Sequence, residues 1–332
     1  MIARPIENCR DMNQPWPLVY ILLLNWNTEK HTLACLASLQ AVSYPNYKII
    51  VLDNASSDGS PDAIAAAYPA IPLLRMPRNL GFTGANNVGF QYALGQGVEF
   101  VYLLNTDTHV ASTFLSEAVQ TATLDKSIGI VGSKVLHADQ PNRLQFVGLH
   151  ANLTVGHHGR PFGYNEVDQG QYDHIADVDL IGGCAMMVSR SCVEATGGFD
   201  DTFFAFHEDF DLCLRAQASG FRVVMSPASR VWHEGGGSMG GATSVGHMYY
   251  SVRNALRLAQ RHKPAANKVM SVFRTGCIIG AHAAQAMLHH PSIGTMAAII
   301  EGTRDYYRGV GGRFLTHLEG RKREVMSNKE RL

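Results

Sequence analysis

Polar side chains follow three apolar runs of the sequence at the points where those runs end. "LVYILLLN" ends at Asn25, "YKIIVLD" ends at Asp53, and "EFVYLLN" ends at Asn105 and leads directly to Asp107. Aspartates in such places can simply cap turns, but Asp53 could also accept a hydrogen bond from the imide N–H of a uracil or thymine. Asp107 stands beside other oxygen donors, a setting that suits Mg2+ or Mn2+ bridged to phosphate.

An acidic cluster lies in "FHEDFDLCLR", residues 206–215, where Glu208, Asp209 and Asp211 crowd the start of an expected helix. Helix N-termini tolerate acids, so capping is one explanation. The neighbouring phenylalanines allow a second explanation, in which a carboxylate in a partly apolar cleft acts as a general base. His233, in "SRVWHEGGGS", has two interpretations as well. A lone histidine is usually structural, but beside a carboxylate metal site it becomes a candidate ligand.

A glycine-rich segment, "RNLGFTGANNVGF" at residues 78–90, includes Gly81. Its glycines permit close approach of a backbone, and the N-terminus of the helix expected after it would favour an anion. A dinucleotide-binding unit places its glycines after the first strand. This chain has "NWNTEK" there instead, which argues against a nicotinamide-dependent oxidoreductase.

Strand and helix patterns alternate four times in about the first hundred residues. The expected strands are 18–25, 47–53, 71–76 and 99–105. Such alternation is typical of a doubly wound sheet with parallel strands, whose ligands bind at the carboxyl ends of the strands. Two later apolar runs, at 128–136 and 177–189, predict further strands that extend the sheet in mixed orientation. Residues 246–308 have a mostly helical pattern.

Composition is that of an ordinary globular protein, with 46% hydrophobic and 17% charged residues. Six cysteines are scattered without a CxxC pair, so we expect reduced thiols in a cytosolic protein. The acids and "QPWP" before the first apolar run are not typical of a signal peptide. That run is also too short to span a bilayer.

Seven segments occur in an order that resembles the inverting family 2 glycosyltransferases of the GT-A fold, and most of all their bacterial rhamnosyltransferase-type members. The resemblance extends from about Val19 to His233, with looser similarity from Tyr249 to Gly312. The segments are "LNWN", "VLDNASSDGS", "NLGFTGANNVG", "LLNTDT", "GGCAMMVSR", "GGFDDTFFAFHEDFDLCLR" and "WHEGGGS".

This resemblance implies a role for each matching residue. Asp53 would read the nucleotide base, while Asp107 and His233 would hold a divalent metal, Mg2+ or Mn2+, on the donor diphosphate. Asp209 would be the catalytic base, with Glu208 beside it as a ligand for acceptor or metal. The donor pocket would further include Asn25, Asn79, Gly81, Asn87, Asn105 and Gly183. The family's metal motif is often Asp-x-Asp, and Asn105 fills its first position here, so we expect weaker or more water-rich coordination.

The expected architecture is an α/β GT-A fold, a Rossmann-like, mainly parallel mixed sheet flanked by helices, with a helical C-terminal region. We expect an N-terminal extension at 1–16, a catalytic domain at 17–245 and a helical subdomain at 246–332. The expected activity is metal-dependent, inverting transfer of a sugar, first of all rhamnose from dTDP-rhamnose, to a hydroxyl of a cell-surface glycan or lipid-linked precursor. Alternatives are a UDP-linked donor (galactofuranose, glucose or N-acetylhexosamine) and a non-catalytic nucleotide-sugar binding module. No nucleic-acid partner is expected.

Charge divides the chain unevenly, with 14 basic and 23 acidic side chains in residues 1–250 but 14 basic and 5 acidic ones in residues 251–332. Arg253, Arg257 and Arg261 recur every four residues and therefore share one face of a helix. One interpretation is a subdomain packed on the catalytic sheet, with these arginines solvated or paired with the acidic body. The other is a surface that rests on anionic lipid, extended by Lys263, Lys268 and Arg274. The second interpretation would make the protein peripheral on the cytoplasmic face of a membrane.

Overall fold

The structure is a computed structural model that describes residues 15–153, 161–235, 244–289 and 292–314. Most of the expected N-terminal extension, including Cys9, lies outside the described residues, as does the end of the expected C-terminal subdomain. The five other cysteines are free thiols, as expected.

The described strands form one mixed sheet in the order β3-β2-β1-β4-β9-β6-β10-β5, with β7 paired to β6 and β8 to β10. Strands β3, β2, β1 and β4 are mutually parallel, and β9 is antiparallel to both β4 and β6. The expected parallel sheet with a mixed extension is therefore confirmed. The strands are β1 (Val19–Asn25), β2 (Tyr47–Asp53), β3 (Leu73–Arg75), β4 (Phe100–Leu104), β5 (Thr108–Val110), β6 (Ile128–His137), β7 (Leu144–Phe146), β8 (Ala176–Asp177), β9 (Ala185–Ser189) and β10 (Arg222–His233).

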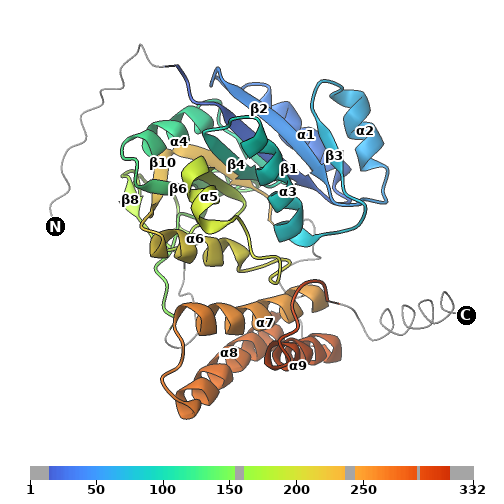
Figure 1. Cartoon of the computed structure of the whole chain (residues 1–332), viewed down its shortest axis with the longest axis vertical. Helices are drawn as coiled ribbons and strands as arrows, with labels where there is room; N and C mark the ends of the chain where they lie inside the picture. Colours follow the sequence, from blue (N-terminus) through green and yellow to red (C-terminus); the bar gives the residue numbers. More distant parts are fainter. Residues whose placement is uncertain (1–14, 154–160, 236–243, 290–291, 315–332) are drawn as a thin grey trace, which may run out of the picture.

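Helices cover both faces of the sheet, and the last three helices form a separate group at one end of the molecule (Figure 1). Tyr20 and Leu22 of β1 belong to the core under α3, α5 and α6, whereas Val19, Ile21 and Leu23 pack under α1, α2 and α4. Burial on both faces explains why the strands are continuous apolar runs. The helices are α1 (Glu29–Leu39), α2 (Ser60–Ala67), α3 (Gly81–Gly95), α4 (Phe114–Thr123), α5 (Arg190–Thr196), α6 (Glu208–Ala218), α7 (Val245–His262), α8 (Lys268–His289) and α9 (Ile293–Tyr307).

Helix α3 begins at Gly81, inside the glycine-rich segment that we expected to precede the helix, so this segment is mostly helical. Glycine is a poor helix former, but packing against the sheet decides here. A Cβ at Gly89 would lie 2.6 Å from Leu22 and 2.8 Å from Leu52. This glycine therefore brings the helix close to β1 and β2.

The three arginines expected on one face of a helix do lie on α7, but the lipid-facing interpretation of that face is wrong. Arg253 is fully buried, and Arg257 donates to the carbonyl oxygens of Thr202 and Val310. Arg261 pairs with Asp200 and Asp211 of the catalytic domain. Arg274, another residue assigned to that surface, is buried as well, and it donates to the carbonyls of Ala259 and Lys263. The basic stripe thus docks α7 on the body of the protein.

Helices α7, α8 and α9 share a small core of their own, which includes Met248, Leu256, Ile278 and Ile299. Among the described residues, the helices are all too short or too polar to cross a membrane.

We expect Gly302→Ala to destabilise the protein by about 1–3 kcal/mol, the usual cost of overpacking. The added Cβ would lie 2.5 Å from the backbone oxygen of Tyr249 and 2.6 Å from Val252, where α9 crosses α7. Gly280→Ala in α8 is the matched control, because its Cβ would meet nothing within 4 Å. It should stabilise by about 0.5–1 kcal/mol. Urea unfolding curves measure both, and equal effects would contradict close packing of α7 on α9.

Candidate active site

Parallel pairing places the ends of β1 and β2 side by side, with Asn25 opposite Asp53. The Asn25 side-chain amide donates to Asp53 Oδ1 at 2.9 Å and to Ser60 Oγ at 2.7 Å, and its oxygen accepts from Thr28 and Thr32. Asn25 is fully buried, so we infer that it orients Asp53 and does not touch the donor itself. Asp53 keeps lone pairs beyond those used by Asn25.

A second asparagine, Asn54, ties the end of β2 to the start of α3. Its amide donates to Asn79 Oδ1 at 3.1 Å, and its oxygen accepts from the Leu80 N–H at 2.7 Å. Asn79 Oδ1 also accepts from the Gly81 N–H at 2.8 Å. Gly81 has φ +76°, and a Cβ there would meet the backbone oxygen of Phe204 at 2.4 Å. The glycine therefore accommodates a loop of this same chain.

Asn87 of α3 also uses its side chain to connect two segments of the chain. Its amide nitrogen donates to the Phe199 carbonyl at 2.9 Å and to Asp201 at 2.8 Å, and its oxygen accepts from the Phe199 N–H at 2.9 Å. Since both ends of the side chain are engaged, we infer that Asn87 fixes residues 199–201 and does not line the donor pocket.

Asp107 and His233 meet where β10 pairs with β5. His233 Nε2 lies 3.2 Å from Asp107 Oδ1 and 3.5 Å from Asn105 Nδ2. On the other side of the ring, Nδ1 is 2.6 Å from Gln145 Oε1. Because an amide oxygen can only accept, Nδ1 carries the hydrogen, and in the neutral ring Nε2 is left as an acceptor directed toward Asp107.

This donor set fits a divalent cation. A carboxylate oxygen and an imidazole lone pair face each other across 3.2 Å, with the ring orientation fixed by Gln145, as in many histidine metal ligands. In the described part of the chain, no cluster of three or more histidine, cysteine or acidic side chains is placed to hold a metal. A cation held by Asp107 and His233 would therefore take its remaining ligands from water and phosphate oxygens.

Glu208 and Asp209 are the first two residues of α6, and Asp209 contacts the backbone of Gly183. Asp209 Oδ2 accepts from the Gly183 N–H at 2.8 Å, and Oδ1 accepts from the Phe210 N–H at 2.8 Å. Burial raises the pKa of Asp209 to about 6, although these hydrogen bonds act in the opposite direction. Burial is the main cause, and the charge of Asp209 the second, of a Glu208 pKa that lies well above its usual range. Glu208 Oε2 is buried without a hydrogen-bond partner, consistent with a protonated group.

The thiol of Cys184 connects the two carboxylate sites. Burial raises its pKa to about 12, and the charges of both Asp107 and Asp209 contribute further to that rise. The Cys184 carbonyl also accepts from the Asn105 N–H at 2.9 Å. Asp107 and Asp209 therefore both lie near Cys184.

The loop that leads into α6 has an unusual backbone. Phe204, Phe206 and His207 all have positive φ, between 66° and 70°, although none is glycine. Such conformations cost of order 1–3 kcal/mol each and persist only where neighbouring structure enforces them. Phe204 is inserted into the core of the C-terminal helices, where its ring stacks on Tyr250 at 5.2 Å.

Two adjacent residues of α7 hold this loop. The Asn254 amide donates to the carbonyls of Phe203, Ala205 and Phe206 at 2.8–2.9 Å. Arg253 donates to the carbonyls of Phe203 at 2.8 Å and Thr202 at 3.1 Å, and to Asn254 Oδ1. The loop carbonyls that would otherwise lack partners are thus satisfied from α7, immediately before Asp209.

Sequence reasoning missed Gln145, Asn54 and Asn254. Gln145 lies in a strand of three residues, and Asn54 and Asn254 act through backbone atoms distant in sequence, so no spacing pattern could reveal them. Arg253 was noticed for its spacing, but its partners were not predicted.

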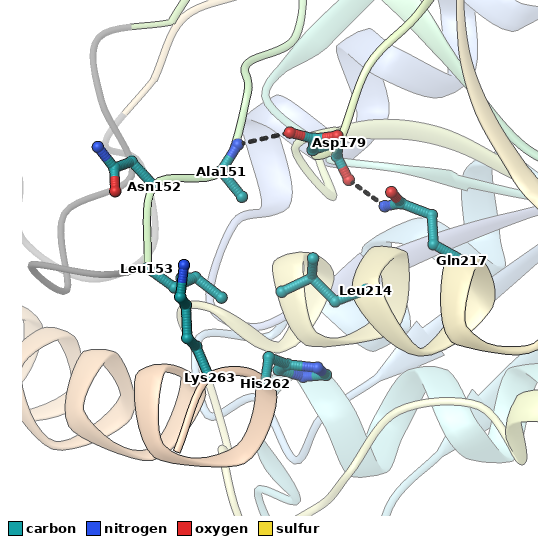
Figure 2. Close-up of a pocket in the computed structure, with 8 residues that line it drawn as sticks. All are labelled: Ala151, Asn152, Leu153, Asp179, Leu214, Gln217, His262 and Lys263. Atoms are coloured by element: carbon teal, nitrogen blue, oxygen red, sulfur yellow. Dashed lines mark hydrogen bonds between the residues drawn. The ribbon is translucent and has the colours of Figure 1, made fainter. Parts of the chain in front are cut away.

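One cavity of about 290 Å3 lies apart from these carboxylates, between α6, the end of α7 and residues 151–153 (Figure 2). Asp179 at its edge accepts from the Ala151 N–H through its side chain and from Gln217 through its carbonyl. We interpret this cavity as a gap between packed elements.

Comparison with known proteins gives a consistent result. The family model "Glycosyltransferase like family 2" matches residues 16–261. The chain is 24% identical over 258 residues to N-acetylglucosaminyl-diphospho-decaprenol L-rhamnosyltransferase of Mycobacterium tuberculosis, which covers 73% of this chain and 84% of that protein. It is 24% identical over 311 residues to the dTDP-rhamnosyl transferase RfbF of Shigella flexneri, with 89% and 98% covered.

A further relative, the uncharacterized protein y4gI of Sinorhizobium fredii, is 26% identical over 238 residues, which are 68% of this chain but 25% of that protein. Among solved structures, the mannosyltransferase PcManGT from Pyrobaculum calidifontis, in complex with GDP-Man and Mn2+, superimposes with a TM-score of 0.56 at 14% identity. The superposition covers 89% of this chain and 91% of that one, and it confirms the expected GT-A fold.

We expect Gln145→Ala to weaken Mn2+ binding about 10- to 100-fold, the usual effect of removing the partner of a histidine ligand. Titration calorimetry with Mn2+ and a nucleoside diphosphate measures the affinity without any turnover. Gln120→Ala, at an exposed position of α4, is the matched control and should bind Mn2+ as the wild type does. Unchanged affinity in Gln145→Ala would remove His233 from the metal site.

Proposed function

Because the chain belongs to glycosyltransferase family 2, we propose that it is a metal-dependent, inverting glycosyltransferase that uses a nucleotide-diphosphate sugar. The observation that carries this proposal is the pairing of two different carboxylate sites around Cys184. One, with Asp107 and His233, suits a cation on a diphosphate, and the other, with Asp209, suits proton transfer.

On the donor side, Asp53 would accept a hydrogen bond from the base, oriented by Asn25. Asp107 and His233 would bind the cation that holds the diphosphate, with Asn105 beside them. When bound, a divalent cation would supply charge neutralisation for the diphosphate as it leaves. The Mn2+ and GDP-Man in the mannosyltransferase structure support this arrangement by analogy of fold.

On the acceptor side, Asp209 would take the proton of the attacking hydroxyl. The acceptor oxygen forms the new bond to the anomeric carbon while the bond to the diphosphate breaks, and a single displacement of this kind inverts that carbon. A base with a pKa of about 6 is largely ionised at neutral pH and still basic enough to accept the proton. Glu208, whose pKa is raised by burial, would lie beside Asp209 as a ligand for the acceptor.

We further propose dTDP-rhamnose as donor and a surface glycan or lipid-linked precursor as acceptor, because two relatives that match most of their length carry rhamnosyltransferase names. A lipid-linked acceptor would bring the protein to a membrane surface. The competing proposal is the same reaction with a UDP-linked sugar.

A donor panel tests this choice. We expect the protein, with Mn2+, to release dTDP from dTDP-rhamnose in the presence of a lipid-linked or oligosaccharide acceptor, with slower release from UDP-sugars. Mass spectrometry of the acceptor identifies the transferred sugar. Exclusive use of a UDP-sugar would select the alternative donor, and binding without turnover of any donor would favour a non-catalytic module.

The base assignment is tested with two isosteric substitutions. Asp209→Asn should lower kcat by roughly 10²–10⁴-fold and leave donor affinity nearly unchanged. In the wild type, kcat/KM should fall as the pH drops through about 6, because Asp209 must be ionised to act.

Glu208→Gln is the matched control for that experiment. Because burial and the charge of Asp209 favour the neutral form of Glu208, the glutamine should preserve most of kcat and the position of the acidic limb. An inactive Glu208→Gln beside an active Asp209→Asn would move the base by one residue.

A further inference from the structure

Helices α8 and α9 expose an unusual amount of apolar side chain. Val269 of α8 is 79% exposed, Leu288 is 80% exposed, and Ile293 of α9 is 91% exposed. We call the set Val269, Val272, Phe273, Leu288, Ile293 and Ile300 the α8–α9 apolar face. Exposed patches of this kind mark surfaces that meet a partner or a membrane.

The apolar face lies on the side of the two helices that does not pack against α7. The opposite sides of α8 and α9 bury Ile278, Ala286 and Ile299 in the core that they share with α7 (Figure 1). From Thr275 to Ile300 the sequence contains no aspartate, glutamate, lysine or arginine. The exposed stripe of each helix is therefore apolar and uncharged over most of its length.

The exposed charge at one end of this face is positive. Lys268 is exposed at the start of α8, and Arg308 is exposed directly after α9. Lys263 instead lines the cavity beside residues 151–153, and Arg313 follows Gly312, whose N–H donates to the Thr202 carbonyl. The acids of the described residues 246–314 are Glu301 and Asp305, neither of them exposed. Glu301 pairs with Arg304, and Asp305 accepts from the Tyr249 hydroxyl at 2.8 Å. The exposed charge around the face is thus positive.

We propose that the α8–α9 apolar face docks on an anionic membrane surface, with its apolar side chains inserted shallowly and Lys268 and Arg308 at the headgroups. Helices with an apolar face and basic flanks bind membranes in this way. This proposal concerns membrane attachment and goes beyond the transfer reaction. It places the membrane contact on α8 and α9, whereas the sequence had suggested the arginines of α7.

Vesicle sedimentation of the full chain, without donor or acceptor, tests the proposal, so its failure is distinguishable from failure of the proposed activity. We expect binding to phosphatidylcholine vesicles that contain anionic lipid, at least about tenfold weaker binding to neutral vesicles, and release at high salt. Each basic side chain near an anionic surface should contribute about fivefold to the affinity at low salt. Lys268→Gln combined with Arg308→Gln should therefore weaken binding strongly.

The triple variant Leu288→Ser, Ile293→Ser, Ile300→Ser should lower vesicle binding by at least about tenfold. Its matched control is Tyr164→Ser, Val167→Ser, Ile175→Ser, which removes exposed apolar side chains from the catalytic domain and should bind as the wild type does. Unchanged binding by the first triple variant would overturn the proposal. A wild-type protein that stays in the supernatant with anionic vesicles would overturn it as well. In that case, a dimer in sedimentation velocity that the first triple variant abolishes would show that the face binds a second copy of the chain.

Discussion

The contact between α7 and the loop before α6 is the constraint on which the rest of the site depends. The carbonyls of Phe203, Ala205 and Phe206, in a strained stretch of backbone, accept hydrogen bonds from Arg253 and Asn254, both fully buried. Buried carbonyls without partners would cost more than the hydrogen bonds themselves contribute. The C-terminal helices therefore support the proposed catalytic site, because the loop that they hold ends at Glu208 and Asp209.

The same loop links the two halves of the site. Thr83 at the start of α3 donates its N–H to the Phe204 carbonyl, and Gly81 leaves room for that carbonyl. On the other side, Gly183 donates to Asp209. Asp209 is therefore held by backbone groups in a buried place that raises its pKa, while Asp107 and His233 lie at the edge of the sheet beyond Cys184. In the proposed mechanism, one fold thus provides two carboxylates with different tasks.

The sequence was most informative where one physical signal dominates. Continuous apolar runs predicted the parallel strands, and their ends predicted polar groups at one edge of the sheet, where Asn25 and Asp53 lie. Contacts between distant side chains and backbone atoms left no such signal. The spacing of Arg253, Arg257 and Arg261 correctly predicted one helix face, but spacing does not say whether that face meets lipid or protein. Likewise, glycines that favour a loop in isolation became part of α3 because packing required them.

The central claim is that α7 positions the catalytic loop, and steady-state kinetics of Asn254→Ala measures it most directly. Arg274→Ala is the control, because it removes a buried side chain that donates to carbonyls within the C-terminal helices and does not touch the loop. The account predicts that Asn254→Ala lowers kcat about 10- to 100-fold with little change in the KM for donor, whereas Arg274→Ala loses stability and keeps its kcat. An unchanged kcat in Asn254→Ala, or an equal loss in both variants, would contradict the account.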